Sequence, residues 1–219
     1  MTAALLELRD ASAGYGGRAV LRGLDLSLRP AEHVVVLGRS GAGKSTLLAL
    51  LYQRLADRAA LIPQAAALVG TLSVFHNVYM GCLDRHSALR NLRMLAFPAR
   101  EEVASVRSVL GSVGMEEYLF HRAGALSGGQ QQRVSVARAL YNGRPVVIGD
   151  EPVSALDRMQ GAEVLRRLAA RHETMVLAMH DIGLALAHAH RILVLDAGQI
   201  VMDAPASQLA IGDLLPFYG

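Results

Sequence analysis

The chain has 219 residues, of which 52% are hydrophobic, and this is enough for one large domain or two small lobes around a buried core. No apolar run approaches the roughly 18 to 20 residues that span a bilayer, so the sequence excludes a transmembrane helix. Lys and Arg (22) exceed Asp and Glu (19) by three and form no dense basic block, so we expect no nucleic-acid partner.

Two short strands are predicted near the start of the chain, over residues 5–9 and 24–29. The second alternates apolar and polar residues with a period of two, which is typical of an antiparallel strand with one exposed face. Between them, residues 14–17 form a glycine-rich turn that carries one aromatic ring. Two interpretations of that ring, Tyr15, stay open: an ordinary core or surface aromatic, or a flat surface that stacks on a nucleotide base.

The next segment has the order strand, glycine-rich loop and helix. An apolar strand over 34–37 precedes a match to G-x-x-x-x-G-K-[ST], the phosphate-binding P-loop, and a helix follows over about 44–55. The glycines let several backbone N–H groups face one anion, and the helix adds its positive end. Lys44 supplies a cation for the outer phosphates, and the Ser45 hydroxyl suits Mg²⁺. The alternative is an ordinary Gly/Ser turn, but both flanks favour a nucleoside triphosphate site. The residues expected to bind nucleotide here are Gly38, Arg39, Ser40, Gly41, Ala42, Gly43, Lys44, Ser45 and Thr46.

A different pattern occupies the middle of the chain. A short strand over 59–62 is stopped by a proline, and Gln64 follows at once. No strand pattern occurs between about 70 and 120, and apolar residues recur at three- and four-residue steps after Pro98, which indicates an amphipathic helix. We therefore expect a mostly helical lobe, over about 72–140, inserted into an α/β core.

The chain then returns to strands alternating with helices. Helices are expected from Leu126 to about 140, over 161–171 and over about 182–189. Strands are expected over 146–149, 174–179, 192–195 and 200–202. This alternation indicates an α/β fold with a mostly parallel sheet covered on both faces.

Two carboxylates follow the uncharged strand 146–149. The carboxyl end of a strand in a parallel sheet faces the ligand crevice, so Asp150 is expected to hold Mg²⁺ and Glu151 to orient or deprotonate the attacking water. The alternative is that both carboxylates cap a helix that starts at Pro152. His180 ends the next strand; a lone histidine there is commonly a hydrogen-bonded surface residue, and the histidines show no convincing metal-ligand spacing.

Order and spacing together carry a family resemblance. Nearly the whole chain resembles the nucleotide-binding subunit of an ATP-binding-cassette (ABC) transporter. The motifs that carry this resemblance are the P-loop, Gln64, the pentapeptide Leu126-Ser127-Gly128-Gly129-Gln130, the pair Asp150-Glu151, the tetrapeptide 154–157 and His180. The pentapeptide resembles the ABC signature, which ordinary P-loop proteins lack. The resemblance implies a P-loop ATPase of ABC type, with a small antiparallel β-lobe and residues 1–219 forming one ATPase domain.

The resemblance also implies roles for single residues. Tyr15 would stack on adenine, and Gln64 would reach Mg²⁺ and the attacking water and also sense the membrane partner. Glu151 would be the catalytic base, and His180 would contact the γ-phosphate. Asp157 would belong to a loop that crosses to a second subunit. The cofactors implied are ATP and Mg²⁺.

The signature pentapeptide implies a second copy of the chain. Ser127, Gly128, Gly129 and Gln130 open a helix, whose N–H groups and positive end suit an anion. In the family, this helix start closes over the ATP held by the P-loop of the other subunit. We therefore expect a head-to-tail homodimer with two composite ATP sites.

The chain departs from the family between the P-loop and Gln64. From Lys44 to Gln64 there are 20 positions (64 − 44). ABC cassettes usually carry more, so we expect that a strand pair of the family is missing here. We expect a shortened β-lobe and an altered path for Gln64, without loss of a phosphate-contacting residue.

Residues 72–78, Gly81 and 95–98 resemble the entry of the helical lobe in phosphonate importer ATPases. This implies transport of phosphonate or a related oxyanion, with permease subunits as direct partners and a solute-binding protein as an indirect one. The alternatives are an importer ATPase for another small solute and a non-transport, ATP-gated interaction module. One cysteine and no signal peptide favour the cytoplasm, so the protein is expected at the inner face of the plasma membrane through its permease.

Overall fold

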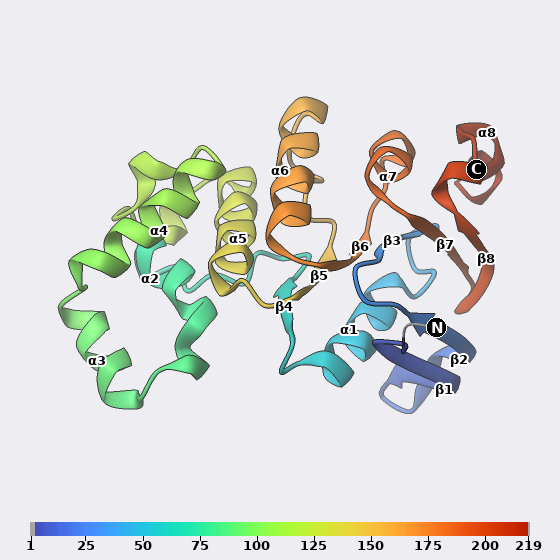
Figure 1. The fold of residues 1–219 in the computed structure, drawn as a ribbon, viewed down its shortest axis with the longest axis horizontal. Coiled ribbons are helices and arrows are strands. Elements are labelled where there is room, and N and C mark those ends of the chain that lie inside the picture. Colours follow the sequence, from blue (N-terminus) through green and yellow to red (C-terminus); the bar gives the residue numbers. More distant parts are fainter. Residues whose placement is uncertain (1–2, 219) are drawn as a thin grey trace. The chain divides into compact units, whose positions relative to one another are not determined.

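The computed structural model describes residues 3–218, and these form two compact units. The first unit combines Met1–Leu61 with Arg144–Gly219, and the second is Ile62–Gly143. In Figure 1 the second unit is the cyan-to-yellow segment that contains α2 to α5. Nothing in the described part of the chain forms a helix long and apolar enough to cross a membrane.

A six-stranded sheet with the order β4-β5-β6-β3-β7-β8 forms the framework of the first unit. Neighbouring strands from β5 to β7 pair in parallel, and β8 pairs antiparallel to β7. Helices α6 and α7 lie on one side of the strands in Figure 1, and α1 lies on the other. The strands are β3 His33–Leu37, β4 Ala59–Ile62, β5 Val146–Asp150, β6 Thr174–Ala178, β7 Arg191–Asp196 and β8 Gln199–Pro205; the helices are α1 Lys44–Leu55, α6 Arg158–Arg171 and α7 Ile182–His188. The predicted α/β fold is confirmed, and each predicted strand and helix of this unit is present.

The sheet is buried because its strands have few polar side chains. Each residue of β5 and of β6 is buried, as expected for parallel strands covered on both faces. Leu47 and Leu51 on α1 pack with Val34, Val36 and Ile148 in one apolar cluster. This packing fixes the strand ends that carry the polar side chains of the site.

A two-stranded antiparallel sheet makes up the small β-lobe. Strand β1 spans Leu6–Tyr15 and β2 spans Arg18–Leu28, so both extend further than the predicted 5–9 and 24–29. The predicted alternation holds in β2, where leucines are buried and the intervening residues exposed. Helix α1 ends at Leu55 and β4 begins at Ala59, so no strand pair lies between them in this described stretch.

The second unit is helical. Helix α2 packs against α4 and α5, and one isolated β-bridge joins Ser73 to Arg122. Ser73 and Ser87 cap α2 and α3, and each accepts a hydrogen bond from a backbone N–H of the first turn. The elements are α2 Val74–Tyr79, η1 Met80–Arg85, α3 Ala88–Ala96, α4 Arg100–Ser112, η2 Glu116–Tyr118, η3 Ala123–Ala125 and α5 Gly128–Asn142. The predicted absence of strands between about 70 and 120 agrees with these elements.

A short segment follows β8 and returns to the first unit's sheet. It contains η4 Ala206–Gln208, α8 Ile211–Leu214 and η5 Leu215–Phe217. Helix α8 packs against α7, and the Leu214 side chain is fully buried. The segment is therefore part of the packed first unit.

A buried histidine makes the stability of the fold dependent on pH. The Nδ1 of His172 donates to the Arg144 carbonyl oxygen at 2.6 Å, since a carbonyl oxygen only accepts, and Nε2 has no partner among the described residues. Burial lowers the pKa of His172, the hydrogen bond to Arg144 opposes this shift, and the nearby Arg171 charge adds to it. The unfolded chain therefore binds the proton more readily than the folded one.

We expect the melting temperature to fall as the pH drops below about 6.5, the ordinary histidine pKa, because the unfolded state then gains protons that the folded state excludes. Each kcal/mol lost corresponds to roughly 2–4 °C for a chain of this size. His172→Asn keeps a hydrogen-bond donor but does not titrate, so it should reduce the pH dependence between pH 7.5 and 5.5. Part of the dependence should remain, because burial also lowers the pKa values of His33 and His188. His121→Asn, at an exposed histidine, is the control. Equal slopes for both variants would contradict the assignment.

Candidate active site

The glycine-rich loop joins the end of β3 to the start of α1, and two of its glycines have a structural reason. Gly38 has a φ of 140°, and a Cβ there would lie 2.1 Å from the Leu195 carbonyl oxygen. Gly43 has a φ of 105° and is the N-cap of α1. Since larger residues rarely adopt such φ values, only glycine lets the chain turn from strand into helix this tightly. The β7–β8 hairpin supports the turn, because Gly198 N–H donates to the Ala42 carbonyl at 3.1 Å.

Lys44 lies folded against this loop. Its Nζ donates to the carbonyl oxygens of Gly38 at 2.6 Å and Arg39 at 3.1 Å, and the residue is only 7% exposed. Burial lowers the pKa of Lys44, whereas the charges of Glu151 and Asp150 act in the opposite direction. The loop thus holds one ammonium group beside two carboxylates.

The remaining loop residues leave an open surface for an anion. Arg39, Ser40, Gly41 and Ser45 are exposed, whereas Thr46 is buried in the first turn of α1. The first N–H groups of a helix have no intrahelical partner, and the helix dipole adds positive potential there. The structure therefore brings the predicted P-loop residues together at the start of α1, a setting that suits an anion.

The two predicted carboxylates lie at the carboxyl end of β5. Asp150 is the last residue of the strand and is 8% exposed. Glu151 has a φ of 52°, a left-handed conformation that is uncommon for a residue with a side chain, and its N–H donates to the Ala178 carbonyl at 3.0 Å. Such backbone conformations concentrate at functional sites. The alternative that these carboxylates cap a helix starting at Pro152 is wrong, because turns follow and α6 begins at Arg158.

His180 contacts Glu151 directly. The two residues are 29 positions apart, and His180 Nε2 lies 2.6 Å from Glu151 Oε1. The His180 side chain is 41% exposed and that of Glu151 is 18% exposed, so solvent reaches the pair. A cavity of about 210 Å³ opens beside them, lined also by Ser154, Arg158 and Asp181. A carboxylate hydrogen-bonded to an imidazole at an open cavity is suited to orienting and deprotonating a water molecule.

Oxygen ligands for a magnesium ion are present in the first unit. The Ser45 hydroxyl is exposed at the first turn of α1, and the Asp150 carboxylate ends β5. Among the described residues no group of three or more His, Cys, Asp or Glu could hold a metal ion. A hydroxyl and one carboxylate fit Mg²⁺, which usually takes few protein ligands and completes its shell with water and phosphate oxygens.

Gln64, Tyr15 and Asp157, the other residues predicted for the site, lie in three different parts of the chain. Gln64, in the second unit, lies in an exposed bend after β4. Tyr15 is the last residue of β1, and its side chain falls outside the described residues. Asp157 is exposed and caps α6 by accepting from the Gln160 N–H at 2.9 Å. Asp157 thus has a structural role in its own subunit.

The predicted signature segment caps α5 in the second unit. Ser127 Oγ accepts from the Gln130 N–H, and Gln130 Oε1 accepts from the Ser127 N–H at 2.8 Å, which makes a complete capping box. A Cβ at Gly128 would meet nothing within 4 Å. The packing of the described chain therefore does not explain why this position is glycine.

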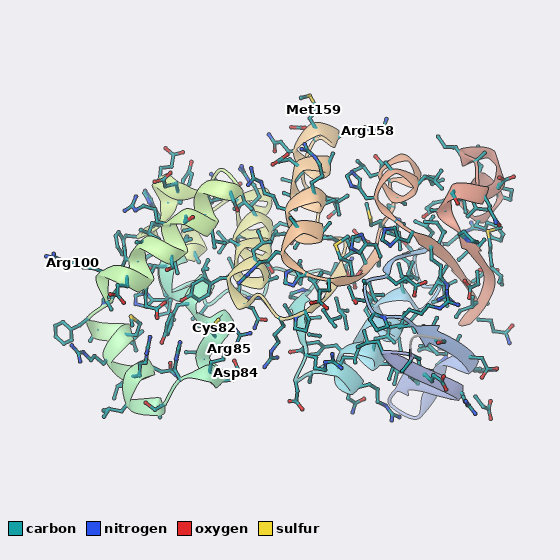
Figure 2. All side chains as sticks on the ribbon, viewed as in Figure 1. Cys82, Asp84, Arg85, Arg100, Arg158 and Met159 are labelled. Atoms are coloured by element: carbon teal, nitrogen blue, oxygen red, sulfur yellow. The ribbon has the colours of Figure 1, made fainter. Side chains whose placement is uncertain are left out.

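Sequence reasoning missed Arg158 and Asp181 as residues of the cavity beside Glu151. Figure 2 shows Arg158 and Met159 at the start of α6. A Cβ at Gly183 would lie 2.3 Å from an Arg158 guanidinium nitrogen, so the arginine covers the first turn of α7. Asp181 caps that helix by accepting from the Leu184 N–H at 2.8 Å. The capping role of Asp181 could have been predicted, because an Asp just before an apolar helix is a common N-cap. Nothing in the sequence indicated that Arg158 would lie over the first turn of α7.

A parallel sheet that carries a P-loop on one strand and an Asp-Glu pair on another defines a P-loop nucleoside triphosphatase. The family model described as "ABC transporter" matches residues 21–154, more than half of the chain. The chain therefore belongs to the ABC transporter family, as an ATP-binding ABC ATPase domain, and the resemblance drawn from its motifs is confirmed.

Several curated relatives match over most of the chain. A phosphonates import ATP-binding protein of Caulobacter vibrioides is 33% identical over 98% of this chain and 93% of that protein. One of Anaeromyxobacter dehalogenans is 37% identical over 97% of this chain, which spans about half (48%) of that protein. A pyoverdine export ATP-binding/permease protein of Pseudomonas entomophila is 39% identical over 95% of this chain and 35% of that protein.

Solved structures show the same fold. The dimeric structure of a bacterial ABC transporter cassette has a TM-score of 0.79 at 25% identity and covers 91% of this chain and 98% of that one. A cassette dimer in a post-hydrolysis state with ADP and Pi also has a TM-score of 0.79, at 24% identity, with the same coverage. The predicted ABC-type fold, with a mostly parallel sheet and a small antiparallel one, is confirmed.

Proposed function

We propose that this chain hydrolyses Mg·ATP as the motor subunit of a membrane transporter. The observation that carries this proposal is the Glu151–His180 contact of 2.6 Å, in the same unit as the P-loop and Lys44. In the proposed reaction, Lys44 and the N-terminus of α1 bind the phosphates and Glu151 orients and deprotonates water. His180 holds Glu151 and meets the γ-phosphate. Mg²⁺, held by Ser45 and Asp150 with Gln64 approaching it, would neutralise phosphate charge when bound.

We further propose that two copies of the chain share each ATP. The packing of its own chain does not explain why residue 128 is glycine, because a Cβ there would meet nothing within 4 Å. Gly128 follows Ser127, the N-cap of α5, and so lies at the positive end of that helix. A phosphate from the partner's nucleotide fits such a helix start, with Ser127, Gly128, Gly129 and Gln130 as its donors. Asp157 would lie at the same dimer contact and Tyr15 against the adenine. In this proposal, residues 1–219 act as one ATPase domain into which the helical unit is inserted.

The second unit offers a surface for the permease. A cavity of about 430 Å³ is lined mainly by apolar side chains of α2, η1 and α3, among them Met80 and Leu83, and by Leu72 just before α2. Two of its lining leucines are largely exposed, Leu92 at 66% and Leu95 at 49%, and exposed apolar side chains grouped in this way mark an interaction site. We propose that a helical segment of the permease binds here and so places the chain at the cytoplasmic face of the inner membrane.

We propose phosphonate or a related oxyanion as the transported solute, delivered by a solute-binding protein. Support comes from the relatives named as phosphonates import proteins. Residues 72–78, Gly81 and 95–98 also resemble the helical-lobe entry of that group. The test is uptake of a radiolabelled phosphonate by proteoliposomes that contain the chain, its genomically adjacent permease and an externally added binding protein. ATP-dependent uptake supports the proposal, and hydrolysis without phosphonate uptake would point to another solute.

Leu92→Asp should abolish uptake and copurification with the permease, because it places a charge in the apolar cavity of the second unit, the groove proposed to bind the permease. ATP affinity of the isolated chain should stay within about twofold, since Leu92 is exposed and lies in the helical unit. Leu215→Asp is the matched control, because Leu215 is also exposed but belongs to the first unit. If Leu92→Asp still assembled and transported normally, this groove would not be the permease site.

A second candidate function is a non-catalytic, ATP-gated interaction module. The short path from α1 to β4 raised this alternative, but the relatives named as transport proteins favour the motor. The two functions differ in ATPase rate in the permease complex. A near-zero rate that Glu151→Gln leaves unchanged would favour the gated module.

A further inference from the structure

The segment after β8 reaches the end of the sheet that carries the active site. Leu214 of α8 is fully buried and α8 packs against α7, the helix that begins just after His180. The start of α8 is fixed by Asp213, whose Oδ2 accepts from the Ala210 N–H at 2.8 Å. Four residues after Leu214, the chain places Tyr218 beside the site.

Tyr218 contacts His180 and its neighbour in the chain within the first unit. Its ring meets the His180 ring edge to face, with centroids 6.5 Å apart and planes at 79°. Its hydroxyl donates to the carbonyl oxygen of Met179, the neighbour of His180, at 3.5 Å. Burial raises the pKa of Tyr218, and a backbone hydrogen bond from Gly38 acts in the opposite direction. One side chain therefore contacts His180 through its ring and Met179 through its hydroxyl.

His180 needs such support because Glu151 holds one end of its ring and the side chain is 41% exposed. An exposed side chain held by one hydrogen bond retains rotamer freedom, and catalysis depends on placing reactive groups within a fraction of an ångström. An edge-to-face aromatic contact restricts the ring from a second direction.

We propose that Tyr218 is a positioning residue for hydrolysis, which fixes the ring of His180 against Glu151. This inference rests on the proposed ATPase function. It assigns a role in that reaction to a segment outside the P-loop, the carboxylate pair and the signature.

The first test compares Tyr218→Ala, Tyr218→Phe and the control Phe217→Ala in the permease complex. Tyr218→Ala should lower kcat roughly 3- to 10-fold, the loss expected for one aromatic contact, with KM for ATP changed less than about twofold. Tyr218→Phe keeps the ring and should retain most of the rate, and it also guards against misfolding of the alanine variant. Phe217→Ala, the adjacent aromatic, should leave kcat near wild type.

The second test asks whether Tyr218 acts through His180. In a His180→Gln background, Tyr218→Ala should cause little further loss, because residues that act as a unit are not additive. The His180 ring proton signals, assigned by their loss in His180→Gln, should shift in Tyr218→Ala and stay close to wild type in Phe217→Ala.

Three outcomes would overturn the proposal: a wild-type kcat for Tyr218→Ala, an equal loss for Phe217→Ala, or a full additional loss in the His180→Gln background. These differ from a failure of the ATPase function itself, in which the wild-type complex would hydrolyse no ATP. A loss confined to KM would also contradict the inference, because it would place Tyr218 in nucleotide binding.

Discussion

Glu151→Gln is expected to lower ATP hydrolysis by about 100-fold or more while ATP binding remains. Glutamine keeps the size of the side chain and a carbonyl oxygen near His180 Nε2, but it cannot take a proton from water. ATP should then persist and hold two copies of the chain together. The measurements are phosphate release and size-exclusion chromatography with and without Mg·ATP.

Two variants serve as controls for this result. Glu163→Gln makes the same chemical change at a surface carboxylate of α6 that pairs with Arg166 and Arg167, and it should hydrolyse ATP at the wild-type rate. Adding Gly128→Arg to Glu151→Gln should prevent the ATP-bound dimer, because a large side chain then occupies the open space at the start of α5. If Glu151→Gln stayed monomeric with ATP, even with the permease's docking segment present, the shared-site proposal would fail.

Lys44→Ala is expected to weaken ATP binding at least about tenfold and to reduce turnover to background. Lys44 is the charged group of the P-loop, and its ammonium would exchange two loop carbonyls for phosphate oxygens when ATP binds. Arg54→Ala, at the last turn of the same helix, is the matched control and should bind ATP normally. ATP affinity is measured by equilibrium titration of the isolated chain and turnover in the permease complex.

Lys44 is the only lysine of the chain, so chemical labelling of amines offers a second test of its role. Burial lowers the pKa of this amine, so a larger fraction is neutral and reactive than at an exposed lysine of ordinary pKa, although burial also limits access. Acylation detected by mass spectrometry should therefore modify Lys44 and the N-terminal amine, and saturating ATP should protect Lys44 alone. Unchanged labelling with ATP, or ATP affinity retained in Lys44→Ala, would contradict the assignment.

The sequence determined the elements of this protein and the identity of most site residues. Strands 34–37 and 146–149 are uncharged runs, and their burial in a parallel sheet follows from that composition. The P-loop could be predicted because its glycines stand where the backbone adopts a positive φ, as at Gly38 and Gly43, and this requirement is local. The capping box of Ser127 and Gln130 was equally local.

Tertiary structure alone decided how distant residues meet. The strand order β4-β5-β6-β3-β7-β8 places chain segments side by side that no local pattern connects. The 2.6 Å contact of Glu151 with His180, the placement of Arg158 over Gly183 and the contact of Tyr218 with His180 depend on that order. The left-handed backbone of Glu151 is likewise imposed by its surroundings, because the residue type does not favour it. Spacing along the chain fixes local hydrogen bonds, whereas contacts between strand ends follow from how the whole sheet packs.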